Sequence, residues 1–192
     1  MRNRLAAISA ATMLLLALTA NATESAAAAA GTTEAAFGKP NPKGPKELSQ
    51  YDFLAGDWVA DVTLVQQNGV PFKYVASWHN HWTADGYVMV QEWIGPYAMG
   101  IELRTFNMTT KKWDGRNIYE PSPGVWYENT AELIGDEMIV TTQKKTAEGE
   151  PFLSREIYFD ISSESFSIRS EISYDGGKEW RPGKYSLVAT RS

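Results

Sequence analysis

Cysteine is absent from the 192-residue sequence. The chain therefore has no disulfide bond, thiolate metal site, iron–sulfur cluster or cysteine nucleophile, and it is not a lipoprotein anchored through a cysteine. Histidine is scarce, with only His79 and His81. Positive charge is not in excess either, because the formal net charge is −5, and this argues against a nucleic-acid partner. Aromatic residues make up 12% of the chain, which is enough to expect a packed core.

Motifs of the common enzyme classes are missing as well. The sequence contains no Gly-x-Ser-x-Gly elbow, no phosphate-binding loop and no dinucleotide fingerprint. It has no internal repeat, which argues against a propeller. Acid–base chemistry by the two histidines stays open. We lean towards a protein that is not an enzyme, and we expect no cofactor.

Residues 1–22 have the parts of a secretory signal peptide. Arg2 and Arg4 give a positive start, residues 5–20 are apolar, and Ala20-Asn21-Ala22 offers the small residues that a signal peptidase reads. The alternative, an uncleaved anchor, is less favoured because a spanning helix needs roughly 20 apolar residues. Cleavage would remove two arginines and no acid, which changes the net charge from −5 to −7. We predict a periplasmic or secreted protein with no membrane span after cleavage.

The rest of the chain divides into a tether and a domain. Residues 23–46 are rich in alanine, glycine and proline and have no hydrophobic periodicity, so we expect a flexible tether. Residues 47–192 should form the folded domain. Its first residues, 47–54, predict one helical turn that acts as a short N-terminal helical plug.

From Asp57 onward, short runs of β-branched and aromatic residues alternate with turn signals. Asn68-Gly69 is a strong two-residue hairpin signal, and Ala84-Asp85-Gly86 is the next turn signal along the chain. The spacing of the signals is typical of an antiparallel meander. A closed barrel hides the edges of so many strands best. We therefore predict an all-β, antiparallel up-and-down β-barrel, with a two-sheet sandwich as the alternative.

Two motifs lie at opposite ends of this meander. Gly56-Asp57-Trp58 opens the first strand, and Arg191 ends the last one. The pair resembles the calycins, the lipocalin-like barrels, in which a Gly-x-Trp packs under an arginine of the last strand. The resemblance implies that Gly56, Trp58 and Arg191 close the barrel, and a guanidinium over an indole stabilises by on the order of 1 kcal/mol. The alternative is that Trp58 is only a core residue.

A wider set of motifs is more specific. The segments 51–58, 85–87 and 173–180 occur in an order that resembles a bacterial exported lipocalin-like family of unknown function. That resemblance covers about residues 51–191 and implies a calycin-type β-barrel without supplying catalytic residues. The segment Ser173 to Trp180 also fits the Asp-box pattern, Ser-x-Asp-x-Gly-x-x-Trp. We interpret this single copy as a structural hairpin turn.

His79-Asn80-His81 is the one place where a metal site could begin. Residues two apart on a strand project to the same face, so both imidazoles could reach one ion. A third ligand such as Glu92 is needed. A three-residue loop at Ala84-Asp85-Gly86 would put Glu92 on the other face, whereas a two-residue loop would bring it to the histidine face. We favour two partly exposed histidines and no metal.

Seven tryptophans lie in the predicted domain. Trp78 and Trp82 share a strand face, Trp93 lies on the next strand, and Trp126 follows. They could fill the barrel, or they could line a cavity for an apolar or planar ligand. We favour the cavity, because calycin-like barrels commonly enclose one. The predicted ligand-binding residues are Trp78, Trp82, Trp93, Trp126, His79 and His81.

Charged residues also share strand faces with apolar groups. Glu92 and Arg104 are examples, and Arg155 is another. A buried charge must be paired. The faces could therefore hold an interior Glu–Arg network that orients a ligand, or they could face solvent. We favour solvent.

Three hypotheses follow. The leading one is an exported barrel that binds a small, largely apolar molecule. The second is a barrel enzyme, an isomerase or hydrolase, that uses His79, His81 and Glu92. The third is an interaction module with a filled core that meets an envelope partner. The oligomeric state and the ligand's identity stay open.

Overall fold

A computed structural model describes residues 38–120, 122 and 124–192. The predicted signal peptide and most of the predicted tether lie outside these residues. One 3-10 helix, η1, precedes ten strands. The elements are η1 (Lys46–Tyr51), β1 (Gly56–Val65), β2 (Pro71–Thr83), β3 (Val88–Ile94), β4 (Met99–Asn107), β5 (Lys112–Tyr119), β6 (Tyr127–Ile134), β7 (Glu137–Lys145), β8 (Pro151–Phe159), β9 (Ser165–Ser173) and β10 (Arg181–Arg191).

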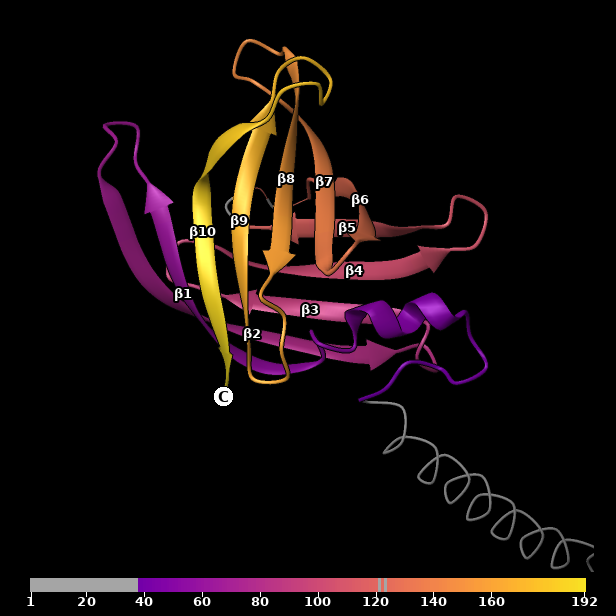
Figure 1. Cartoon of the computed structure of the whole chain (residues 1–192). Helices are drawn as coiled ribbons and strands as arrows, with labels where there is room; N and C mark the ends of the chain where they lie inside the picture. The colour runs from indigo at the N-terminus through magenta and orange to yellow at the C-terminus, as the bar shows by residue number, and fades with distance from the viewer. Residues whose placement is uncertain (1–37, 121, 123) are drawn as a thin grey trace, which may run out of the picture. The chain divides into compact units, whose positions relative to one another are not determined.

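The ten strands form one closed antiparallel barrel. Each strand pairs with its neighbour in the sequence, and β1 also pairs with β10. Strands β3 to β5 run across the view of Figure 1 whereas β8 to β10 run from top to bottom, so the two sides of the barrel cross steeply. The prediction of an all-β antiparallel barrel is confirmed, and the sandwich alternative is wrong. Among the described residues, no helix is long and apolar enough to cross a membrane.

Alternation along the strands separates the inside of the barrel from the outside. In β1, the buried residues Trp58, Ala60 and Val62 alternate with outward-facing neighbours. The same period of two places Trp78 and Trp82 of β2 inside. Period-two alternation is what a strand with one buried face requires.

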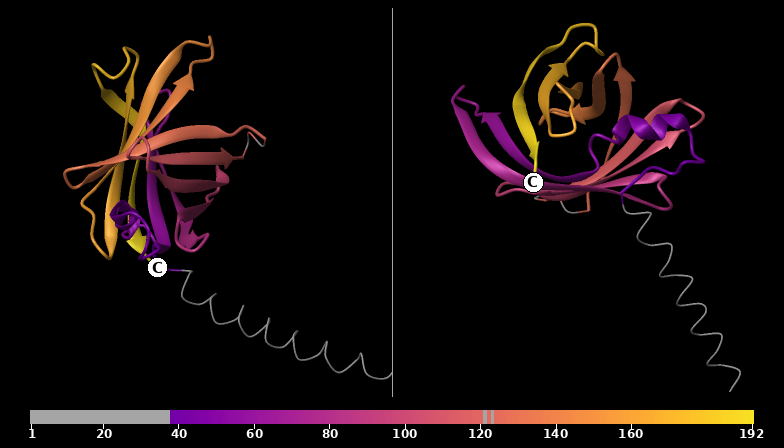
Figure 2. Two further views of the ribbon diagram at one scale, coloured as in Figure 1. Left: turned by 90° about the vertical axis from the view of Figure 1, so that its right-hand side faces the viewer. Right: turned by 60° about the horizontal axis from the view of Figure 1, so that its bottom comes forward.

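Only one end of the barrel is filled. Tyr51 of η1 packs edge-on against Trp113 with ring centroids 4.7 Å apart, and Phe53 packs against Phe166 at 5.4 Å. Leu48 and Tyr51 are buried. Figure 2 shows η1, in indigo, at the same end of the barrel as the end of β10. These aromatic contacts fill this end of the barrel.

Two hairpin loops differ in length from the expectation. At Asn68-Gly69 the Gln66 N–H donates to the Val70 carbonyl at 3.0 Å, and Gly69 has φ +81°, so the loop is longer than two residues. A glycine in the left-handed region is the common ending of such a loop.

The loop between β2 and β3 holds four residues, 84–87, because Thr83 pairs with Val88. Both lengths considered from the sequence are wrong. The Asn41 side chain donates to the Asp85 carbonyl and carboxylate, each at 2.8 Å, and the Asn41 N–H donates to the Gly86 carbonyl. A segment about forty-five residues earlier in the sequence therefore shapes this loop.

The β9–β10 turn is confirmed as a structural hairpin. The Asp175 carboxylate accepts the N–H groups of Lys178 and Glu179, both at 3.0 Å, and the Ser173 hydroxyl at 2.7 Å. These bonds lower the pKa of Asp175, and the Glu179 N–H contributes most. Trp180 packs beneath the turn against Arg155, with 3.9 Å from Cζ to the ring centroid.

Candidate functional site

The other end of the barrel is hollow. A cavity of about 450 Å³ occupies it. Its rim includes the exposed side chains of Tyr127, Lys144 and Lys145. The full lining consists of Tyr74, Trp78, Gln91, Trp93, Ala98, Glu102, Arg104, Asn117, Tyr119, Tyr127, Asn129, Val140, Thr142, Lys144, Lys145, Glu156, Tyr158, Ile168 and Tyr185.

A row of polar side chains crosses the inner wall beside this cavity. Asn80 lies opposite Gln91, Gln91 opposite Glu102, and Glu102 opposite Asn117, on four successive strands. We call these four residues the polar belt. The strand register alone brings them together, because opposite residues of an antiparallel pair point to the same face.

Arg104 is the centre of the polar network. Its Nη2 lies 3.0 Å from Glu102 Oε2 and donates to Gln91 Oε1 at 2.7 Å. Gln91 in turn donates to the Tyr119 hydroxyl at 2.8 Å. Burial lowers the pKa of Arg104, but the Glu102 carboxylate and the nearby tyrosine hydroxyls together outweigh burial and raise this pKa above its ordinary value. The guanidinium is 2% exposed, so it stays charged and paired.

Glycine makes room for the second partner of Glu102. Asn129 Nδ2 donates to Glu102 Oε1 at 2.7 Å. Gly115 lies opposite both Arg104 and Asn129, and a Cβ at Gly115 would overlap the Asn129 amide. Both carboxylate oxygens of Glu102 are thus occupied, one by Asn129 and one by Arg104.

Glu156 is a second acid inside the barrel. It lies on β8, where Val140 of β7 and Ser170 of β9 are its directly opposite neighbours. Burial raises the pKa of Glu156, and the nearby Glu102 raises it further, while Lys144 and Arg104 lower it. The cavity therefore contains a carboxyl group that loses its proton less readily than an exposed carboxyl group does.

The four tryptophans predicted to bind ligand lie in three different environments. Trp78 and Trp93 line the cavity, with ring centroids 5.5 Å apart. Trp82 is fully buried at the filled end, where its ring centroid lies 6.3 Å from that of Trp113. Trp126 is 49% exposed and lines a groove on the outer surface. The structure thus brings together two of the four.

Both histidines project from the outer face of β2. His79 Nδ1 lies 2.8 Å from Asp57 Oδ1, and Glu92 is opposite His79 on β3. Glu92 is therefore on the histidine face, as the shorter of the two predicted loops would also have placed it. No group of three or more His, Asp or Glu side chains in the described parts of the chain is arranged to hold a metal ion.

The first and last strands meet where the sequence motifs lie. Trp58 is opposite Arg191, whose Cζ lies 4.2 Å from the centroid of the Trp58 ring. Arg191 Nε donates to the Ser163 carbonyl at 2.7 Å, and Nη1 donates to the Ala55 carbonyl at 3.1 Å. Gly56 has φ +124°, and a Cβ there would overlap the guanidinium.

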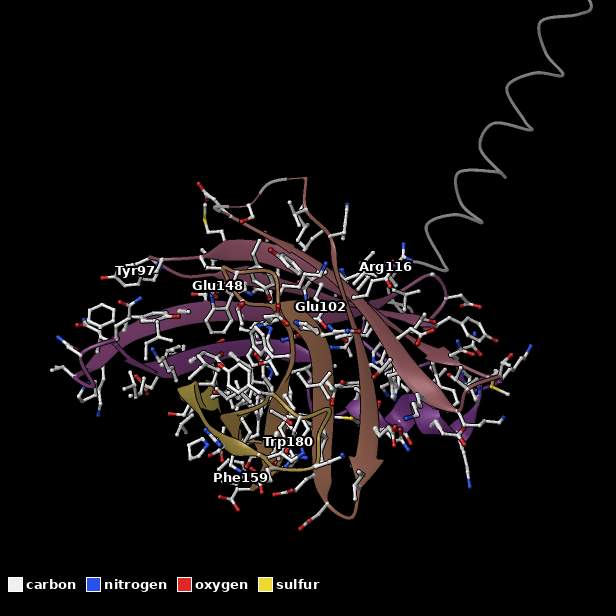
Figure 3. The ribbon with its side chains drawn as sticks, turned by 90° about the horizontal axis from the view of Figure 1, so that it is seen from above. Tyr97, Glu102, Arg116, Glu148, Phe159 and Trp180 are labelled. Carbon is white, nitrogen blue, oxygen red and sulfur yellow. The ribbon has the colours of Figure 1, made fainter. Side chains whose placement is uncertain are left out.

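The expectation that the mixed charged faces point to solvent is wrong for Arg104, which is interior, and correct for Glu92, which is exposed. Figure 3 shows Glu102 near the middle of the molecule, with Tyr97 and Arg116 farther out. Sequence reasoning missed Glu102 and Glu156 as cavity residues. The signal was present in β4, where Glu102 shares a face with Arg104 and Phe106.

Comparisons with known proteins give the fold a distant neighbour. The crystal structure of Rv2717c from M. tuberculosis is similar to this chain with a TM-score of 0.49 and 10% sequence identity, over 77% of this chain and 98% of that one. No family model and no curated protein matches the chain. The chemistry of the cavity therefore has to follow from its own residues.

Proposed function

We propose that this protein is an exported, lipocalin-like β-barrel that binds a small, partly apolar molecule in its interior. The observation that carries the proposal is the cavity of about 450 Å³, which lies in the size range of small-molecule sites. It combines an aromatic wall with a few converging polar groups, which is the usual composition of such sites.

The division of the barrel into two halves supports the same function. Residues 47–54 act as a plug that contributes Tyr51, Phe53 and Leu54 to the filled end. The remaining end stays open to a ligand. The pairing of Arg191 with Trp58 supports the lipocalin-like assignment, and residues 1–22 support export as a signal peptide.

A binding function is favoured over an enzyme that uses the two histidines. His79 and His81 lie on the outer wall, and the cavity lining does not include them. The ligand-binding residues that we retain are Trp78 and Trp93. The envelope-partner alternative would require a filled core, and a hollow end argues against that requirement.

The proposal is tested by filling the cavity. Thr142 faces the cavity, and its neighbour Thr141 faces the outer groove. A panel of lipophilic probes should change the tryptophan fluorescence of the wild-type protein and of Thr141→Trp, once each variant's own starting emission is subtracted. Thr142→Trp should weaken this binding by roughly tenfold or more, because the indole occupies the probe's space.

Native mass spectrometry of protein purified from its own host completes the test. The expected species begins at Thr23 and carries a retained small molecule. A mass without a ligand, together with no fluorescence response to any probe, would disprove the binding function. A chain that still carried residues 1–22 would disprove cleavage and leave the binding result unaffected.

A further inference from the structure

The charged groups of the cavity are not equally available to a ligand. Glu102 is occupied by Asn129 and Arg104, as described above. Arg104 Nη2 contacts Glu102 and Gln91, whereas its Nε and Nη1 are buried without a hydrogen-bond partner in the described part of the chain. The Glu102 carboxylate is therefore already satisfied, and the unpartnered guanidinium nitrogens of Arg104 have almost no exposed surface on which a ligand could bind.

Glu156 has no such partner. Its opposite neighbour Val140 is apolar. Its other opposite neighbour, Ser170, has a hydroxyl that donates to the Tyr185 carbonyl at 2.7 Å and accepts the Tyr185 N–H at 3.0 Å. Among residues 38–120, 122 and 124–192, no group lies within hydrogen-bonding or ion-pairing distance of the Glu156 carboxylate. Lys144 influences it only from a longer distance, since its side chain is exposed at the rim.

Three aromatic rings line the same cavity as this carboxylate. Trp78 and Trp93 pack edge to face with ring centroids 5.5 Å apart, and the ring centroid of Tyr158 lies 6.3 Å from that of Trp78. All three line the cavity together with Glu156. Ring faces attract cations, and a desolvated site strengthens the attraction. A carboxylate without a partner among aromatic rings is the arrangement that recognises an organic ammonium group.

We propose that the cavity binds an organic amine as its ammonium ion, with the charged nitrogen on Glu156 and the apolar body against Trp78, Trp93 and Tyr158. This inference rests on the proposed small-molecule binding function and specifies its ligand class. An ammonium supplies the donors that Glu156 lacks, so the bound complex satisfies the carboxylate.

The test uses three ligands of similar shape and different charge: phenethylamine, 2-phenylethanol and 3-phenylpropanoate. Binding to the full chain is measured by calorimetry and tryptophan fluorescence at pH 8, where a primary amine stays protonated. Phenethylamine should bind roughly tenfold or more tightly than the alcohol, and the carboxylate ligand should bind most weakly.

Two variants test whether Glu156 causes the preference for the amine. Glu156→Gln should abolish the advantage of the amine while it leaves the affinity for 2-phenylethanol unchanged. Glu92→Gln makes the same change on the outer wall and should leave all three affinities unchanged. Equal binding of amine and alcohol, or an amine preference that survives in Glu156→Gln, would overturn this inference and leave the binding function intact. Failure of all three ligands and of the lipophilic probes would overturn both.

Discussion

Single side chains decide the chemistry of this barrel, and Glu102 and Glu156 show how. Both are acids on inward-facing strand positions, yet one has two close partners and the other has none among the residues that the structure describes. The difference arises from neighbours: the missing side chain of Gly115 leaves room for Asn129 to reach Glu102, whereas Glu156 lies directly opposite Val140. The same residue type therefore stabilises the interior at one position and remains available at another.

The raised pKa of Glu156 predicts a pH-dependent stability. The unfolded chain loses this proton near the ordinary value of 4.5, whereas the folded chain keeps it to a higher pH. Folding therefore binds more protons in that window, and the free energy of unfolding falls as pH rises through it. Glu156→Gln should remove this fall, so the variant gains stability relative to wild type as the pH rises above 4.5.

Urea unfolding at a series of pH values measures the effect. Glu92→Gln is the control, because Glu92 is exposed on the outer wall. A wild-type stability profile that is parallel to the profile of Glu156→Gln would show that the folded carboxyl titrates normally.

Residue-scale prediction from the sequence was limited by one ambiguity. Alternation shows that Glu102, Arg104 and Phe106 share a face, but it does not tell which face of β4 is inside. A face with two charges out of three positions has the composition of a solvent-exposed face. Only the pairing of β4 with β3 and β5, which brings Gln91 and Asn129 to these charges, makes their burial tolerable.

The strand pair β5–β6 depends on Gly115, which makes room for the Asn129 side chain. Gly115→Ala should push the Asn129 amide away from Glu102 and destabilise the protein by about 1–3 kcal/mol, the cost of a buried acceptor that loses its donor. Denaturant unfolding measures this change. Gly38→Ala is the control, because a Cβ there meets no neighbouring atom. In an Asn129→Ala background the cost of Gly115→Ala should disappear, and an unchanged cost would refute the side-chain overlap.

Loops show where element-scale prediction from sequence succeeds and fails. The β9–β10 turn was predictable, because every hydrogen bond of Asp175 is made within four residues of it. The β2–β3 loop was not, because Asn41 holds it from a distant part of the chain. Local signals locate both turns, but only a local network also determines the number of residues in the loop.

The whole barrel depends on the joint between its first and last strands. Arg191→Ala removes the guanidinium from Trp58 and its bonds to three carbonyl groups. Because Arg191 is partly open to solvent, the expected loss in free energy of unfolding is about 1 kcal/mol. Hydrogen exchange should quicken along β1 and β10 before it does so elsewhere.

Arg181→Ala is the matched control, since Arg181 begins the same strand and is exposed. Equal protection of the β1–β10 amides in Arg191→Ala and wild type would show that backbone pairing alone holds the joint. The antiparallel barrel itself was predictable from the meander, whereas the division into a filled and a hollow end depends on which aromatic residues meet η1 in space.

The pairing of β1 with β10 also sets an order of events during folding. Trp58 and Arg191 are separated by almost the whole domain, so their contact is among the least local in the molecule. Strand β1 can pair with β2 early, but its other edge must wait for the tenth strand. Until then the protein is an open sheet with two unpaired edges, and non-local pairing of this kind is slow. The growing sheet is therefore most exposed to intermolecular strand pairing just before β10 pairs with β1 and closes the barrel.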